Sequence, residues 1–360
     1  MATCGAGSPA RSARADGRRA VSVQSHTAPA AAAARPRGAV GRAKLERRLR
    51  LAAPLIVLVA LCLLLGLANP NFLSTGNFVR VATAASIPLV LTLGATFIIL
   101  LGSIDLSIEG MMAVAAIVLT LLVANDSGGG FDIGLAAVPV AIAAGTAMGL
   151  FNGALHVGLR IPSFMATIGS WFIGLGTATI LLGGGSVRIL DPDIRALALT
   201  RLAGMPLSVW IALAALAVAW VIQTQTRFGR HVYAIGGGED LAALSGVPIR
   251  RTKVIAFALA GTFYGLASVL AAAQLGLANA EIGTGRLFTT VTAVVVGGTS
   301  LMGGQGGVLN ALIGVLIVAV LANGMVLLGI PPYLQQAAQG LMIIVAVALS
   351  LDRSQLRIVK

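Results

Sequence analysis

The sequence predicts an all-α integral membrane protein with about ten transmembrane helices. Of the 360 residues, 57% are hydrophobic and only 10% are charged, and the mean hydropathy is +0.94. Apolar runs long enough to cross a hydrocarbon core of about 30 Å recur along the chain. The 45 glycines suit helix packing in lipid, where small residues let backbones approach. This composition excludes the soluble-enzyme classes.

Ten spans are expected, with both chain ends in the cytoplasm. They fall near residues 51–68, 79–101, 104–124, 133–156, 163–182, 206–222, 254–273, 288–302, 307–328 and 334–350. The second and third are separated by almost nothing, and the eighth is short. Alternation from a cytoplasmic N-terminus places the turn 157–162, the loop 223–253 and the tail 351–360 inside. Basic residues in all three segments agree with the positive-inside rule.

Residues 1–50 are predicted to be a disordered cytoplasmic tail, followed by a transmembrane domain at 51–350. The tail holds eleven Lys and Arg residues against two acidic residues, most of the total charge of +13. Its Ala, Pro, Ser and Arg content argues against a packed domain. Because it lacks interleaved aromatic residues, we expect it to orient the first span and rest on anionic lipid rather than bind nucleic acid.

A short pattern that occurs twice in the sequence suggests an inverted repeat of spans 2–5 and 7–10. Asn152-Gly153 is followed by Ile161-Pro162, and Asn323-Gly324 by Ile330-Pro331. By the span count the two sites lie on opposite sides of the membrane, as such a repeat requires. The alternative is that both dipeptides are common turn signals.

The long polar interruption at 226–253 predicts a short helix at 239–246. Its signals are acidic residues at the start, good helix formers in the middle and breakers at the end: Glu239 and Asp240, Leu241 to Leu244, then Ser245, Gly246 and Pro248. Such a helix is either a small knob for a partner's groove or a connector lying on lipid headgroups.

Residues 102–110 place two carboxylates, Asp105 and Glu109, between the second and third spans. Acidic side chains at membrane depth are costly and usually face a cavity or a partner. The alternative is that Asp105 or Ser107 caps the third span in headgroup water. Spacing alone favours the cap.

Residues 297–307 predict a second broken, non-helical element, because glycine density lets the backbone bend. The phosphate-binding pattern G-x-x-x-x-G-K-[ST] is absent, which excludes ATP binding by that route. The hydroxyls of Thr299 and Ser300 are candidates for weak hydrogen bonds to a passing polar solute. Asn152 and Asn323 are candidates by the same logic, although buried amides more often join helices.

Together these stretches resemble the permeases of ABC importers of the ribose, xylose and arabinose type. The polar loop reads T-x-F-G-R-x-V-Y-A-I-G, then A-A-x-x-S-G-V, then Lys253. The first break reads G-x-I-D-L-S, and the second reads A-V-V-x-G-G-T-S-L-x-G-G-x-G from Ala293. Two positions depart from the family: Gly238-Glu239 stand where Asn usually precedes the docking helix, and Glu109 replaces a small residue. The resemblance covers roughly residues 51–350.

The resemblance implies a non-enzymatic subunit of a bacterial inner-membrane importer for a monosaccharide or similar small polar solute. ATP would bind a separate ATPase chain, docked on the coupling loop 223–253 at Gly238, Glu239, Asp240, Ala242, Ala243, Ser245 and Gly246. The other expected partners are an extracytoplasmic solute-binding protein and a second permease copy or paralogue. The candidate pathway residues are Asp105, Ser107, Asn152, Thr299, Ser300 and Asn323. No cofactor or metal is expected on this chain, since its three histidines are scattered.

Two alternatives stay open. Related permeases import nucleosides or branched-chain amino acids. An ion-coupled secondary transporter, from another class, would need a titrating carboxylate within the membrane, and only Asp105 and Glu109 are placed for it.

Overall fold

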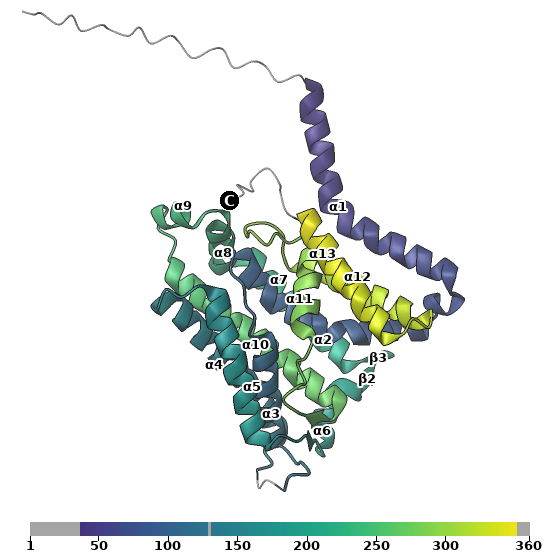
Figure 1. The fold of residues 1–360 in the computed structure, drawn as a ribbon, viewed down its shortest axis with the longest axis vertical. Coiled ribbons are helices and arrows are strands. Elements are labelled where there is room, and N and C mark those ends of the chain that lie inside the picture. The colour runs from purple at the N-terminus through teal and green to yellow at the C-terminus, as the bar shows by residue number, and fades with distance from the viewer. Residues whose placement is uncertain (1–36, 129–130, 351–360) are drawn as a thin grey trace, which may run out of the picture. The chain divides into compact units, whose positions relative to one another are not determined.

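The computed structural model describes residues 37–128 and 131–350 (Figure 1). Among these residues, those up to Arg47 belong to one unit, and those from Arg48 onward belong to a second, compact unit. The helices are α1 (Arg37–Ala68), α2 (Thr75–Leu100), α3 (Ile108–Leu121), α4 (Ala137–Gly158), α5 (Ser163–Leu182), α6 (Pro192–Leu199), α7 (Leu207–Gln225), α8 (Arg227–Gly237), α9 (Glu239–Leu244), α10 (Ile249–Leu275), α11 (Arg286–Val296), α12 (Val308–Leu327) and α13 (Pro332–Ser350). Short 3₁₀ turns lie at Pro70–Leu73 and Gly134–Ala136.

Four two-residue strands form two antiparallel pairs in the connecting segments. β1 (Val187–Arg188) pairs antiparallel with β4 (Leu277–Ala278), and β2 (Arg201–Leu202) pairs antiparallel with β3 (Met205–Pro206). Neither pair forms a layer of its own, so the core is built by helices.

The predicted all-α membrane class is confirmed. Six described helices are long and apolar enough to cross a membrane: Thr75–Leu100, Gly134–Gly158, Ser163–Leu182, Leu207–Gln225, Ile249–Leu275 and Val308–Leu327. Three shorter apolar helices are Ala52–Ala68, Ile108–Leu121 and Arg286–Val296. Ten spans would require these three and α13 as well, so the count of ten stays a prediction.

Some boundaries differ from those expected. α1 begins at Arg37, inside the tail predicted to be disordered, in a stretch rich in the helix formers Ala, Arg and Leu. The predictions for residues 1–36 and 351–360 lie outside the described residues. The second and third spans are separated by a true break at 101–107, since Gly102 adopts a φ of 74°.

The centre of the fold is formed by α2 and α10, which are the most buried of the six long helices. α10 packs along α4 through a glycine-lined contact, in which Gly145 and Gly149 face Gly261 and Gly265. Small residues at a helix crossing let the two backbones touch, which is the main route to tight packing in lipid.

This crossing yields a stability prediction. A Cβ on Gly149 would lie 2.2 Å from the Phe257 carbonyl oxygen, so the two helices must separate to accept it. We expect Gly149→Ala to lower the free energy of unfolding by about 2 kcal/mol or more. Gly169→Ala is the matched control, because nothing lies within 4 Å of its added Cβ. Thermal unfolding in detergent measures both, and equal midpoints would contradict the packing described.

The halves of the bundle show a reciprocal pattern. In each, a long helix (α2, 26 residues; α10, 27 residues) precedes a short one (α3, 14 residues; α11, 11 residues). α10 packs against α3 and α4, and α2 packs against α11 and α12. An inverted repeat of α2–α5 and α10–α13 predicts this exchange. Superposition of the two halves is the test, and until then the repeat stays a prediction.

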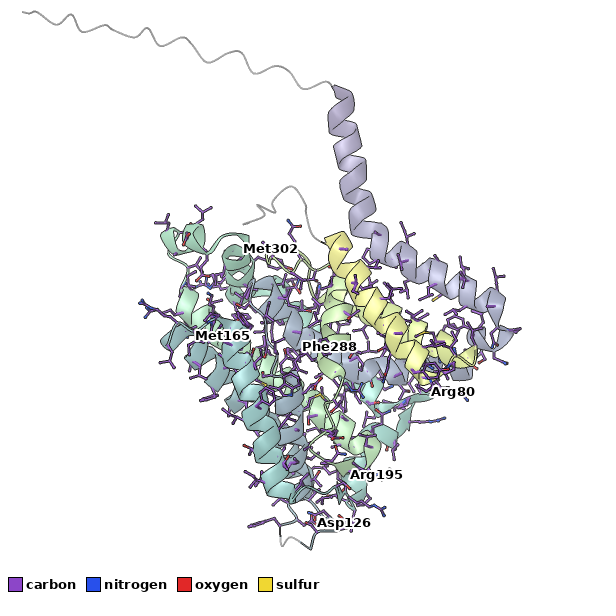
Figure 2. The ribbon with its side chains drawn as sticks, in the orientation of Figure 1. Arg80, Asp126, Met165, Arg195, Phe288 and Met302 are labelled. Carbon is purple, nitrogen blue, oxygen red and sulfur yellow. The ribbon has the colours of Figure 1, made fainter. Side chains whose placement is uncertain are left out.

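Loops that the span count places on opposite sides lie at different ends of the compact unit. Met302 lies at the end that carries α8 and α9, whereas Asp126 and Arg195 lie at the other end (Figures 1 and 2). At this second end the Arg188 amide donates to Asp126 Oδ1 over 2.7 Å. The turn at 160–162 shares a cavity with Glu239 and Lys253 at the first end. The expected alternation of spans requires this separation of loops.

Candidate functional site at the junction of two broken helices

The first break, at 101–107, is organised by Asp105, which is only 5% exposed. Its Oδ1 accepts hydrogen bonds from the Ser107 amide at 2.9 Å and the Ser107 hydroxyl at 2.5 Å. Asn152 of α4 donates from Nδ2 to Ser107 Oγ over 2.9 Å. Three predicted pathway residues therefore form one buried chain of hydrogen bonds.

The capping alternative for this stretch is wrong. Ser107 occupies the N-cap position of α3 but makes no side-chain cap bond, and Asp105 is buried in protein rather than in headgroup water. Two backbone amides of the break donate hydrogen bonds to side chains of α5. Ile104 N donates to Ser163 Oγ, and Leu106 N donates to Thr167 Oγ1, both at 3.0 Å. The break is thus held by side chains from two neighbouring helices.

We expect Asp105 to be needed for this local structure. Asp105→Ala leaves the Ser107 amide and hydroxyl without their acceptor, a loss of about 1–3 kcal/mol in unfolding free energy. Asp105→Asn keeps one amide oxygen for Ser107, and the loss is expected to be smaller. Thermal unfolding of both variants in detergent measures the difference. A midpoint for Asp105→Ala equal to that of the wild type would contradict the assignment.

Glu109 has a partner that sequence reasoning missed. It is 7% exposed, and its Oε1 accepts a hydrogen bond from the Leu287 amide at 3.3 Å. Leu287 lies in the first turn of α11, where a negative charge is favourable to the helix dipole. Glu109 therefore ties the start of α3 to the start of α11.

The predicted second break is confirmed between α11 and α12, at 297–307. Thr299 is fully buried, and its Oγ1 accepts a hydrogen bond from the Gly307 amide at 3.3 Å. The Ser300 amide donates to the Gln305 carbonyl at 3.0 Å, and the Ser300 hydroxyl accepts from the Met302 amide at 3.2 Å. In this conformation both predicted hydroxyls hold the loop itself.

The two breaks and the coupling loop meet at one point. The Gly304 amide donates to the Leu100 carbonyl, at the end of α2, over 2.9 Å. Gly236 of α8 lies against both: an added Cβ would be 1.9 Å from Leu100 O and 2.5 Å from Gly304 N. Gly303 also packs closely on Gly102. We call these five residues the junction.

A second contact joins α8 to the second break. The Tyr233 hydroxyl accepts from Gln223 Nε2 at 2.7 Å and donates to the Gly306 carbonyl at 2.6 Å. Gln223 Oε1 in turn accepts from the Val308 amide, at the start of α12, at 2.7 Å. Burial raises the pKa of the Tyr233 hydroxyl above its ordinary value of 10, against a smaller opposing effect of the Gln223 bond. The hydroxyl therefore remains a donor at neutral pH.

The coupling loop contains two helices, not the single one predicted. α9 begins at Glu239 as expected, with acidic residues in its first turn, and ends at Leu244, two residues before the predicted end, with Gly246 at a φ of 79° beyond it. α8 was missed, although Thr226 caps it and its buried Val232 and Ile235 have helical spacing. Glycines within and after α8 made this segment resemble a loop.

The outward face of α9 is apolar. Leu241 is 71% exposed and Leu244 is 85% exposed, whereas Ala242 is 5% exposed. Lys253 at the start of α10 holds Glu239 through two contacts of 2.7 and 2.8 Å. α9 therefore presents two leucines from a position that an ion pair fixes relative to α10.

Comparison with known proteins decides the family. Residues 77–347 match the family described as branched-chain amino acid transport system / permease component. The chain belongs to this permease family. It is 33% identical over 312 residues to a ribose import permease of Haemophilus influenzae, covering 86% of this chain and 94% of the relative. It is 32% identical to the galactose/methyl galactoside import permease of Escherichia coli K12, covering 82% and 92%, and 30% identical to the D-allose permease of the same strain, covering 81% and 89%. No solved structure matches.

The sequence-predicted coupling residues of the permease lie together on and around α9. Asp240, Ala243, Ser245 and Gly246 are exposed. Ala242 faces inward, which corrects its assignment as a contact for a partner. Leu241 and Leu244, which the prediction did not include, are the exposed large apolar side chains of α9.

The predicted pathway residues of the permease do not form one cluster. Asp105, Ser107 and Asn152 are joined at the first break, and Thr299 and Ser300 lie in the second. Asn323 of α12 instead pairs with Asn77 of α2 through two reciprocal hydrogen bonds of 2.9 Å. Asn323 thus fits the alternative of an amide that joins two helices.

Proposed function

We propose that this chain is the membrane-spanning permease subunit of a bacterial ATP-driven ABC importer for a monosaccharide or a similar small polar solute. The observation that carries the proposal is the junction, where a helix of the coupling loop is seated on both broken elements. Import permeases for ribose, galactose and allose are among its relatives, which supports the solute class.

In this proposal α9 docks on a separate ATPase chain through Leu241 and Leu244. When ATP closes the ATPase, α9 moves. The ion pair between Glu239 of α9 and Lys253 of α10 then transmits this movement to α10. α8 transmits the same movement through Gly236 to the end of α2 and to the second break. Both breaks precede helices of the bundle, and through them the two halves of the bundle exchange inward-open for outward-open packing.

The orientation and the remaining partners are part of this proposal. The end with α8 and α9 faces the cytoplasm of a bacterial inner membrane, and both chain termini lie on that side. The opposite end, with β1, β4 and α6, receives an extracytoplasmic solute-binding protein. A second copy or a paralogue of the permease completes the pathway, and ATP is bound by the ATPase alone.

Labelled-solute uptake tests the proposal. Cells express the chain with its ATPase and binding protein, and a matched strain carries the ATPase without its catalytic carboxylate. We expect uptake of a pentose or hexose that disappears in the matched strain. Uptake of only nucleosides or branched-chain amino acids would overturn the solute class. Uptake that persists without ATP hydrolysis and collapses with the proton gradient would identify a secondary transporter.

A further inference from the structure

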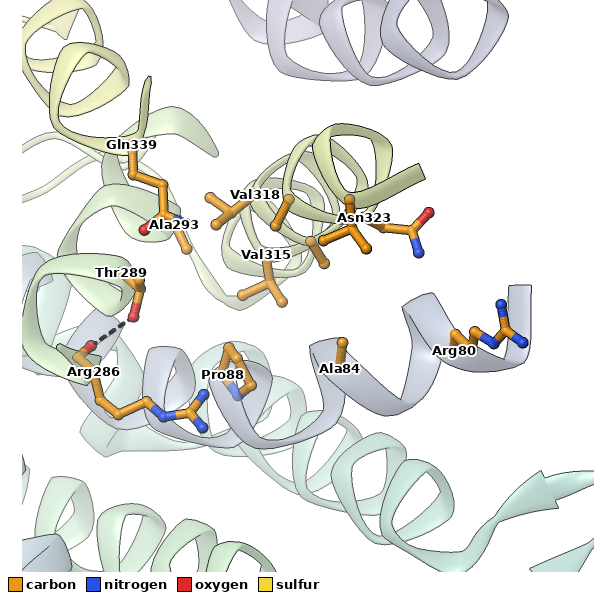
Figure 3. Close-up of a pocket in the computed structure, with 13 residues that line it drawn as sticks. Arg80, Ala84, Pro88, Arg286, Thr289, Ala293, Val315, Val318, Asn323 and Gln339 are labelled. Carbon is orange, nitrogen blue, oxygen red and sulfur yellow. Dashed lines mark hydrogen bonds between the residues drawn. The ribbon is translucent and has the colours of Figure 1, made fainter. Parts of the chain in front are cut away.

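A cavity of about 350 Å³ lies among α2, α11, α12 and α13 (Figure 3). One wall is a single face of α2, formed by Arg80, Ala84 and Pro88 at successive helical turns. The opposite side begins at Arg286, the first residue of α11. Most of the remaining lining is aliphatic, from α11 and α12. The cavity is therefore an apolar space with an arginine at each end.

The two arginines have no counter-charge among the described residues. The salt bridge that these residues contain joins Lys253 to Glu239, far along the chain from either arginine. Arg286 is half-buried, and its side chain extends towards Pro88 inside the cavity (Figure 3). An arginine is charged at any physiological pH, and an unpaired charge is costly in an apolar setting within a membrane.

The N-terminus of α11 increases the positive potential at Arg286. The unpaired amides of a helix start carry a partial positive charge and favour anions. Glu109 is the acidic group at this helix end, but its carboxylate accepts from the Leu287 amide and makes no ion pair with Arg286. The Glu109 carboxylate is thus engaged by the helix backbone, and the Arg286 guanidinium has no ion-pair partner among the described residues.

Some of the other polar side chains that line the cavity already form hydrogen bonds within the protein. Thr289 donates to the Arg286 carbonyl at 3.0 Å, and Asn323 is engaged with Asn77. Among the described side chains, Gln339 of α13 has no hydrogen-bond partner of its own. Its amide is therefore a further polar group of the cavity lining, near Ala293 (Figure 3).

We propose that this cavity binds an oxyanion, a phosphate or carboxylate group, on Arg286. Arg80, which is exposed, lies about 12 Å from Pro88 along α2 and draws the anion to the open end. The group belongs either to the headgroup of an anionic lipid or to an anionic solute such as a sugar acid. The solute source rests on the proposed import function; the lipid source does not.

Thermal unfolding of the purified full chain in phosphatidylcholine nanodiscs tests the site without ATP or uptake. The free-anion probes are sodium phosphate and D-ribonate, each compared with chloride at equal ionic strength. The lipid probe is phosphatidylglycerol mixed into the nanodiscs. The variants are Arg286→Gln and Arg80→Gln, with Arg201→Gln as the control, since Arg201 is exposed in β2 and outside the cavity.

We expect at least one anion to raise the unfolding midpoint of the wild type and of Arg201→Gln by a few degrees. Arg286→Gln is expected to weaken that anion's binding roughly tenfold, the usual scale for one charged hydrogen-bonding partner. A response to phosphate reports the oxyanion site itself. A response to ribonate without one to phosphatidylglycerol identifies a solute source, and a response to phosphatidylglycerol without one to ribonate identifies a lipid source. Should Arg286→Gln not fold, Arg80→Gln must weaken binding severalfold. Equal responses in wild type and variants, or none in any, would overturn the site. Neither result bears on whether the chain imports sugar.

Discussion

Gly236→Ala is expected to abolish ATP-driven uptake while leaving the ATPase bound. The added methyl group would lie 1.9 Å from the Leu100 carbonyl oxygen and 2.5 Å from the Gly304 amide nitrogen, both of them backbone atoms. Such overpacking costs about 1–3 kcal/mol and can be relieved only if α8 lifts from the junction. α9 itself remains intact, because its exposed leucines and its ion pair are untouched.

Gly237→Ala is the control for this variant. It follows in the same helix, yet nothing lies within 4 Å of a Cβ added there. We expect at least a roughly tenfold loss of uptake for Gly236→Ala, since tenfold corresponds to about 1.4 kcal/mol. Gly237→Ala should transport at the wild-type rate. Wild-type uptake in both variants would show that the seat of α8 plays no part in coupling.

Leu241→Ser with Leu244→Ser is expected to release the ATPase. Each substitution removes about 1.5 kcal/mol or more of the free energy gained by burying a leucine in the complex. Together the two substitutions are expected to lower the affinity for the ATPase roughly a hundredfold or more. The folded permease should be unaffected, because both side chains are largely exposed in the free chain. Binding of the purified ATPase to the permease in nanodiscs, with unfolding temperature as a second readout, separates the two effects.

Leu202→Ser serves as the control for the double variant. Leu202 is 57% exposed in β2, at a site outside the coupling loop, so the change removes a comparable apolar surface elsewhere. It should bind the ATPase with wild-type affinity. If the double variant also binds normally, α9 is a connector rather than the docking element.

The local features of this fold were predictable from sequence because local chemistry determines them. The break at 297–307 follows from glycine density, and the bounds of α9 follow from acidic residues in its first turn and Gly246 after its end. α8 was not predictable with equal ease. Its stability comes from packing of Val232 and Ile235 on neighbouring helices, whereas its glycines locally favour a loop.

Partner identities were beyond the sequence because they join distant segments. Glu109 contacts Leu287, which lies 178 residues away in the sequence. Asn323 contacts Asn77, which lies 246 residues away. The inward turn of Ala242 is set by packing of a six-residue helix, which has too few residues to show a periodic pattern. The meeting of both breaks at Gly236 is likewise a property of the folded chain.

The most direct test of coupling through the junction is a ratio measured in proteoliposomes. These contain the permease, its ATPase and the binding protein with labelled sugar, and solute transported is compared with ATP hydrolysed. We expect wild type and Gly237→Ala to have the same ratio of solute transported to ATP hydrolysed. For Gly236→Ala we expect continued hydrolysis with little transport, so that the ratio falls roughly tenfold or more. A ratio for Gly236→Ala equal to that of the wild type would contradict transmission of the ATPase movement through the junction.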